Sequence, residues 1–160
     1  MSGFRPGIRL GVDVGSVRVG VASCDPAGVL ASPVETVARD SRGDTDLRRI
    51  ADLAAELEVI EIVVGLPISL SGKSGAAAAA ASEYAIRLAA ITAPIPVRLV
   101  DERLSTVSAH GNLASAGLGS RARRAVVDQA AAVIILQSAL DAERATGRPP
   151  GQLTEPKGGA

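Results

Sequence analysis

Cysteine and histidine are almost absent from the 160-residue sequence, which contains only Cys24 and His110. One cysteine cannot form a disulfide within the chain, although it could link two copies. A structural zinc site needs four Cys or His ligands at short spacings, and neither residue has such partners. The scarcity argues against a zinc site, and we expect His110 to be an exposed helix residue rather than a general base.

Aromatic residues are equally rare, with one phenylalanine, one tyrosine and no tryptophan. Proteins that bind single-stranded nucleic acid commonly stack the bases on several aromatic side chains. Phe4 and Tyr84 alone cannot form such a platform. The composition therefore disfavours a binder that works by base stacking.

Long hydrophobic runs are also missing. No stretch of about 18 apolar residues could span a bilayer, and residues 1–6 lack the apolar segment of a signal peptide. We therefore expect a soluble, cytoplasmic protein without a membrane partner. The apolar fraction of 47% nevertheless suffices for one hydrophobic core. We predict one domain over residues 7–145, with flexible tails at residues 1–6 and 146–160.

A net charge is lacking as well, because 17 basic and 17 acidic residues cancel. This balance argues against a protein that is cationic all round. The charges are unevenly placed, however: the segment from Arg103 to Val127 contains arginines and no acid. The segment could contact phosphates locally, or it could simply include the solvated start of a helix.

The hydrophobic pattern predicts an α/β fold. Three strands that can pair antiparallel come first, and strands then alternate with helices. Pro33 indicates that the third strand lies at an edge or contains a bulge. We predict strands at 8–14, 17–24, 29–37, 60–64 and 96–100, and helices at 44–58, 74–90, 105–116 and 120–144. This order is typical of a mixed sheet with helices on both faces.

Acidic residues occur where such a fold would place a functional site. Asp13 lies near the end of the first strand, in "GVDVGSVRVGVA", and Asp101 and Glu102 follow "PVRLV". Parallel strands would bring these acids to one edge of the sheet. Strand alternation allows only one of Asp101 and Glu102 to share the side of Asp13, and the pattern does not decide which. Asp128 interrupts the apolar part of the last helix.

Three such acids could each have a local partner; Asp128, for example, could pair with Arg124 one turn earlier. Taken together they are better explained by a bound cation, because closely packed carboxylates would otherwise take up protons. A site built from carboxylates alone favours Mg²⁺ or Mn²⁺. Such ions can activate a water molecule for phosphodiester hydrolysis, which indicates a nuclease.

Four sequence blocks together resemble one family. They are "GVDVGSVRVGVASCDPAG", "IVVGLPISLSGKSG", "VRLVDERLST" and "VVDQAAAVIILQSALD". The chain resembles the YqgF family, RuvC-like pre-16S rRNA nucleases of RNase H-like fold that are also described as Holliday junction resolvases. The resemblance covers residues 9–144.

The resemblance implies a role for particular residues. Asp13, Glu102 and Asp128 match the acids that bind the metal ions and carry catalysis in the family, so Glu102 is preferred over Asp101. The residues expected to contact substrate phosphates are Arg18, Lys73, Arg103, Arg121, Arg123 and Arg124.

The expected function is a metal-dependent endonuclease that processes the 5′ end of pre-16S rRNA in ribosome biogenesis. One alternative is a Holliday junction resolvase of DNA recombination, which would act as a homodimer that makes paired nicks. A second alternative is a binding module for nucleic acid that performs no chemistry. The sequence leaves the choice between RNA and branched DNA open.

Overall fold

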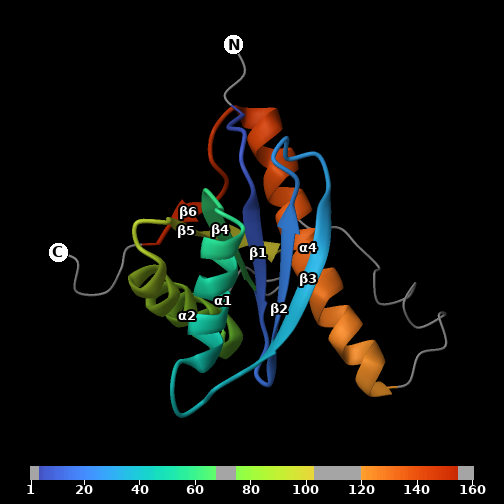
Figure 1. Ribbon diagram of the computed structural model, residues 1–160, viewed down its shortest axis with the longest axis vertical. Helices are drawn as coiled ribbons and strands as arrows, with labels where there is room; N and C mark the ends of the chain where they lie inside the picture. Colours follow the sequence, from blue (N-terminus) through green and yellow to red (C-terminus); the bar gives the residue numbers. More distant parts are fainter. Residues whose placement is uncertain (1–3, 68–74, 103–119, 155–160) are drawn as a thin grey trace.

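The computed structural model describes residues 4–67, 75–102 and 120–154; for residues 120–128 it describes the backbone alone. Its centre is a six-stranded sheet in the order β3-β2-β1-β4-β5-β6 (Figure 1). The strands are β1 (Arg9–Val14), β2 (Arg18–Cys24), β3 (Ala31–Ala38), β4 (Glu61–Leu66), β5 (Val97–Asp101) and β6 (Gln152–Leu153).

Strand direction determines where a site can form. The first three strands pair antiparallel, whereas β4 lies parallel to β1 and β5 lies parallel to β4. The carboxyl ends of β1, β4 and β5 therefore meet at the same edge of the sheet. In α/β sheets this edge is where ligands commonly bind. The predicted mixed sheet with three antiparallel N-terminal strands is confirmed.

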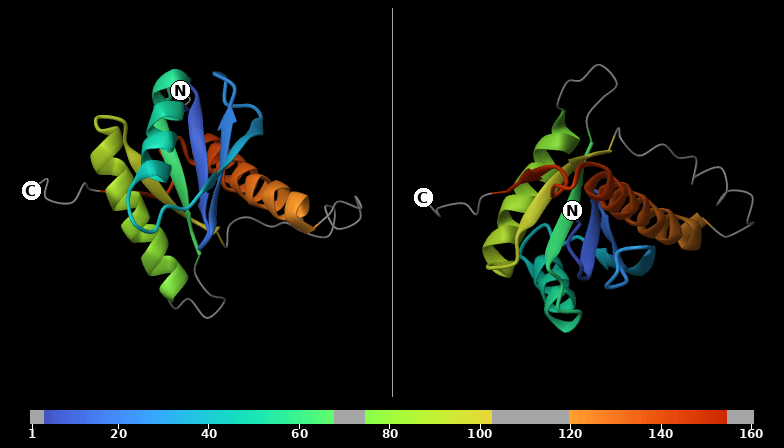
Figure 2. Two further views of the ribbon diagram at one scale, coloured as in Figure 1. Left: turned by 60° about the horizontal axis from the view of Figure 1, so that its bottom comes forward. Right: turned by 90° about the horizontal axis from the view of Figure 1, so that it is seen from above.

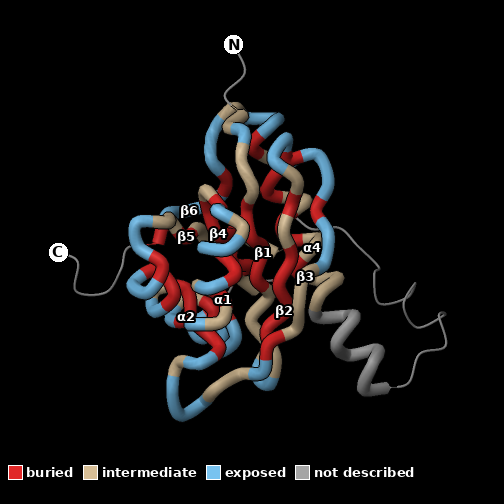
Figure 3. The backbone as a smooth tube through the Cα atoms, viewed as in Figure 1, coloured by how far each residue is buried: buried red, intermediate tan, exposed pale blue. Residues whose placement is uncertain are grey.

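Helices cover both faces of the sheet. Helices α1 (Thr45–Glu56) and α2 (Ala76–Thr92) lie on one face, and α4 (Ser120–Thr146) lies on the other (Figure 2). Each face has its own apolar core, so consecutive residues of the central strands are buried, with successive side chains pointing to opposite cores (Figure 3). The predicted helix at 105–116 lies outside the described residues. No helix in the described part of the chain is long and apolar enough to cross a membrane.

Helix α1 begins without a side-chain cap from its own N-cap residue. Asp44 occupies the N-cap position, but its side chain makes no capping hydrogen bond. Asp40 accepts hydrogen bonds from the backbone N–H and the hydroxyl of Thr45 instead, at 3.1 and 2.8 Å. Asp46, in the first turn, is buried. Asp40 thus accepts from a backbone N–H in the first turn of the helix, whereas Asp46 accepts from the Leu47 N–H and from the Tyr84 hydroxyl.

Pro33 has the consequence that the sequence predicts. It lies in β3, which is an edge strand. The pairing between β2 and β3 shifts register next to Val21, where the partners change from Glu35 to Pro33. A bulge at an edge accommodates a proline that cannot donate to the ladder.

Parts of both predicted tails are ordered against the domain. The Arg5 guanidinium donates to Glu143 at 2.8 Å and to Glu61 at 3.1 Å. At the other end of the chain, β6 pairs antiparallel with β5. The polar composition of these segments predicts disorder, but long-range ion pairs and strand pairing hold them in place.

Candidate active site

Asp13 lies on β1 between two glycines of the neighbouring strands, which have no side chains to crowd its carboxylate. It pairs with Gly20 of β2, and Gly20 in turn pairs with Thr36 of β3. On its other side, Val12 pairs with Val64, so the next residue along β4, Gly65, stands beside Asp13. Two glycines thus flank the acid across the sheet. The half-buried Asp13 side chain faces the α4 side, because Gly11, two residues earlier, contacts α4.

Glu102 reaches the same face from the end of β5. A Cβ atom added to Gly65 would lie 2.8 Å from Glu102 Oε2 and 2.5 Å from Ile135 Cδ1 of α4. The Glu102 carboxylate therefore lies over Gly65, between β4 and α4. The absence of a side chain at position 65 makes room for it.

Strand alternation explains why Glu102 rather than Asp101 lies there. Val100 belongs to the core beneath α4, whereas Leu99 packs against the core on the α1 and α2 side. Two residues after Val100, Glu102 returns to the α4 face. The register of β5 thus answers a question that the sequence pattern leaves open.

The electrostatics of Glu102 indicate a site suited to a cation. Burial, followed by the charges of Asp13 and Asp101, raises the pKa of Glu102 to about 7. A carboxyl group whose ionised form is disfavoured by burial and by like charges is stabilised in that form by a positive ion.

The third predicted acid, Asp128, is in α4, but its side chain lies outside the described residues. The course of α4 can still be followed along β1. Arg9 contacts Glu143, and Gly11 lies against Leu136 and Ala132, so α4 runs antiparallel to β1. The backbone of residue 128 is one turn further along, toward the end of β1 where Asp13 lies.

A hydrogen bond independently shows that the backbone near residue 128 lies beside the end of β1 that contains Asp13. Gln129 Nε2 donates to Thr36 Oγ1 at 2.9 Å, and Thr36 lies in the cross-strand row that contains Gly20 and Asp13. The residue after Asp128 is thus anchored in the row of Asp13. The topology brings the three predicted acids to one end of the molecule.

The donor set fits Mg²⁺ or Mn²⁺. Asp13 and Glu102 offer oxygen ligands only, which suits hard cations. In the part of the chain with described side chains, no group of three or more His, Cys, Asp or Glu residues could hold a metal ion. That part excludes the Asp128 side chain, so a three-carboxylate site stays a prediction.

The predicted phosphate-binding residues are only partly described. Arg18 begins β2 and follows the β1–β2 turn, near the end of β1. Lys73 and Arg103 lie outside the described residues. Arg121, Arg123 and Arg124 are in the first turns of α4, where only the backbone is described.

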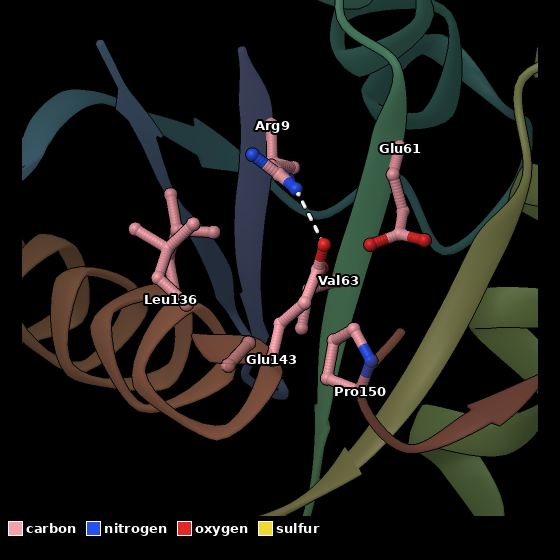
Figure 4. Close-up of a pocket in the computed structure, with 8 residues that line it drawn as sticks. Arg9, Glu61, Val63, Leu136, Glu143 and Pro150 are labelled. Carbon is pink, nitrogen blue, oxygen red and sulfur yellow. Dashed lines mark hydrogen bonds and ion pairs between the residues drawn. The ribbon is translucent and has the colours of Figure 1, made fainter. Parts of the chain in front are cut away.

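A pocket at the other end of β1 and β4 is lined by a buried ion pair and apolar side chains that hold the fold together. It is lined by Arg9, Glu61, Val63, Leu136, Ala139, Leu140, Glu143 and Pro150 (Figure 4). The Arg9 guanidinium and the Glu143 carboxylate, both buried, are 3.1 Å apart. Burial raises the pKa of Glu61 despite its pairing with Arg5. These charges join β1, β4 and α4 far from Asp13, and the lining is otherwise largely apolar.

The sequence patterns do not single out Gly65 or Arg39 as site residues. In the sequence, Gly65 simply follows the predicted strand at 60–64 and precedes Leu66 and Pro67. Its requirement for space arises only when Glu102 and Ile135 converge on it. Arg39 likewise acquires its partners through tertiary contacts.

Comparisons with curated proteins give consistent names. The chain is 58% identical over 156 residues to a protein of Kineococcus radiotolerans, covering 97% of this chain and 82% of the relative. It is 58% identical to one from Clavibacter sepedonicus, covering 94% and 92%, and 57% identical to one from Streptomyces coelicolor, covering 95% and 90%. All three relatives are named "Putative pre-16S rRNA nuclease".

Comparison with solved structures identifies the fold. Thermus thermophilus RuvC, solved in complex with a Holliday junction substrate, superposes with a TM-score of 0.59 at 14% identity. The match covers 89% of this chain and 98% of that one. A further Thermus thermophilus RuvC structure matches with a TM-score of 0.55. The architecture is therefore the RNase H-like fold of RuvC. The model of the RuvX family, described as Holliday junction resolvase, matches residues 7–142, and the chain belongs to this family.

Proposed function

We propose that this protein is a metal-dependent endonuclease that hydrolyses phosphodiester bonds of structured RNA, with the precursor of 16S rRNA as substrate. The observation that carries the proposal is the convergence of Asp13 and Glu102 on the α4 face, at the carboxyl ends of parallel strands. The names of relatives at 57 and 58% identity support the RNA substrate.

Asp13, Glu102 and Asp128 are the residues that would hold Mg²⁺ or Mn²⁺. When bound, such an ion supplies an activated water molecule and stabilises the charge of the leaving oxygen. Both acids with described side chains come from regular strands or their immediate ends, which keep a site more rigid than long loops do.

The protein side chains contribute position and charge. Gly20 and Gly65 leave the space in which the two carboxylates can stand close together. Without a bound ion the pKa of Glu102 is raised to about 7, and a bound cation would favour its ionised form. Arg18, at the start of β2, is proposed to contact a phosphate of the bound strand, and Lys73, Arg103, Arg121, Arg123 and Arg124 are proposed to extend that contact.

A second candidate is a resolvase of branched DNA. The family description and the likeness to RuvC favour it. A resolvase acts on two symmetric strands and would require a homodimer. A module that binds without cleaving is less well supported, because acids that face phosphates weaken pure binding.

The test measures Mn²⁺-dependent cleavage of a pre-16S rRNA fragment and of a synthetic four-way DNA junction. Asp13→Asn is expected to lower the cleavage rate about 10² to 10³-fold with the fold intact. Asp141→Asn, an exposed change in α4, is the matched control. Full activity of Asp13→Asn would disprove the site. Paired, symmetric cutting of the junction alone would favour the resolvase, and no cleavage of either substrate would favour the binding module.

A further inference from the structure

Arg39 joins the turn after Asp13 to the opposite layer of the molecule. It follows β3 directly, and its Nη1 donates to the carbonyl oxygen of Gly15 at 2.8 Å. Its backbone N–H donates to the carbonyl oxygen of Val17 at 2.9 Å. One residue thus binds two carbonyls of the segment that connects β1 to β2.

The turn itself is tight. The Gly15 N–H donates to the Arg18 carbonyl oxygen at 2.9 Å, and a Cβ atom at position 15 would lie 2.6 Å from that oxygen. Gly15 is two residues after Asp13. A displacement of this turn would therefore be transmitted to the end of β1.

The other side of Arg39 faces a buried pair of polar side chains, with an ion pair to Asp46 in which its Nε makes no hydrogen bond. Its Nε lies 3.5 Å from Asp46 Oδ2, and its guanidinium carbon is 5.0 Å from the centroid of the Tyr84 ring. The Tyr84 hydroxyl donates to the same Asp46 oxygen at 3.1 Å. Both Asp46 and Tyr84 are 2% exposed. These side chains come from α1 and α2, so the anchor is part of the helical layer.

The chemistry explains why an arginine stands here. The planar guanidinium can donate to a carbonyl at one end, face a carboxylate at another and lie over an aromatic ring. A lysine has one compact ammonium group and cannot make all three contacts. The interaction with Asp46 is buried, so solvent screens it little.

We propose that Arg39 is a positioning residue, which ties the β1–β2 turn to the Asp46–Tyr84 pair and thereby holds Asp13 in place. Arg39 acts from the face of the sheet opposite to the candidate site and does not touch the substrate. This inference rests on the proposed nuclease function for its kinetic consequence, but not for its structural one.

The experiment compares Arg39→Gln with Arg49→Gln. Arg49, in α1, makes an ion pair with Glu35 at 2.7 Å on the same face, and its guanidinium donates two hydrogen bonds to Glu35. Amide hydrogen exchange is measured for peptides that cover residues 13–19 and, as an internal reference on the other face of the sheet, residues 132–143 of α4. Cleavage of the RNA fragment gives kcat and KM.

Arg39→Gln is expected to speed exchange in the turn about tenfold or more, with residues 132–143 of α4 unchanged. It should lower kcat about 10² -fold with KM nearly constant, because Asp13 acts in the chemical step. Arg39→Lys should recover only part of both effects. Arg49→Gln should change neither quantity.

Tyr84→Phe is a milder variant that removes only the hydroxyl, which donates to Asp46. It supplies a second test of the anchor if Arg39→Gln does not fold. It is expected to loosen the turn by a smaller factor. Wild-type exchange in the turn of Arg39→Gln, or faster exchange with unchanged kcat, would overturn the proposal. If the wild-type protein cleaves no substrate, the nuclease proposal fails, and the exchange data alone decide whether Arg39 holds the turn.

Discussion

Replacement of Gly65 by alanine tests whether the position of Glu102 matters for catalysis. The new Cβ would lie 2.5 Å from Ile135 Cδ1, 2.8 Å from Glu102 Oε2 and 3.0 Å from Glu102 Cγ. Contacts below 3.0 Å force a shift. All three neighbours belong to side chains, so the backbone can stay while Glu102 and Ile135 rotate away.

The geometry separates the effect on stability from the effect on activity. Overpacking a core costs about 1–3 kcal/mol, and we expect the lower end because the neighbours can rotate. A carboxylate moved by about 1 Å can lose about 10²-fold in rate. Gly65→Ala should therefore leave most of the protein folded but lower kcat about 10²-fold.

The assay combines urea unfolding with Mn²⁺-dependent cleavage of the RNA fragment. The double variant Gly65→Ala/Ile135→Val serves as the control, because valine lacks the Cδ1 atom. In that variant the added methyl still meets Glu102, so stability should partly recover while kcat stays low. A kcat of Gly65→Ala within about twofold of wild type would refute the importance of the Glu102 position.

Two further predictions concern charges. The pKa of Glu102 is about 7 in the folded protein against 4.5 as the usual value, so the folded state retains this proton longer. Without metal, stability should fall as pH rises from about 4.5 to about 7 and then level off. Glu102→Gln should lack this fall in thermal unfolding with EDTA, and parallel profiles of the two proteins would contradict it. Glu143→Gln, at the far end of the sheet, leaves the buried Arg9 without its carboxylate and should lose about 3 kcal/mol in urea unfolding. A loss near zero would show that Arg9 finds another partner.

The order of elements was predictable because local patterns carry it. Runs of β-branched residues predict β1 and β2, helical spacing of apolar residues predicts α1, and Pro33 predicts an edge or bulge in β3. The five predicted strands and the predicted helices at 44–58, 74–90 and 120–144 match β1 to β5, α1, α2 and α4 within a few residues, whereas β6 was not predicted. Asp13 at the end of a buried strand was evident for the same reason: an acid among apolar residues contradicts the local pattern.

Local patterns could not predict contacts between residues far apart in the chain. Arg5 and Glu143 are 138 positions apart, so the order of the N-terminal segment was invisible in its polar composition. Asp46 resembles an ordinary first-turn acid of a helix, yet it accepts a hydrogen bond from Tyr84.

The sequence by itself determined the α/β class, the candidate acids and, through four family blocks, the expected chemistry. The tertiary structure decided which acid stands beside Asp13, because only the register of β5 and the position of α4 select a face for Glu102. It also decided that Gly65 must stay without a side chain and that Arg39 reaches the turn after Asp13. The physical reason is common to these cases: each depends on two layers meeting across the sheet, and that proximity arises only on folding.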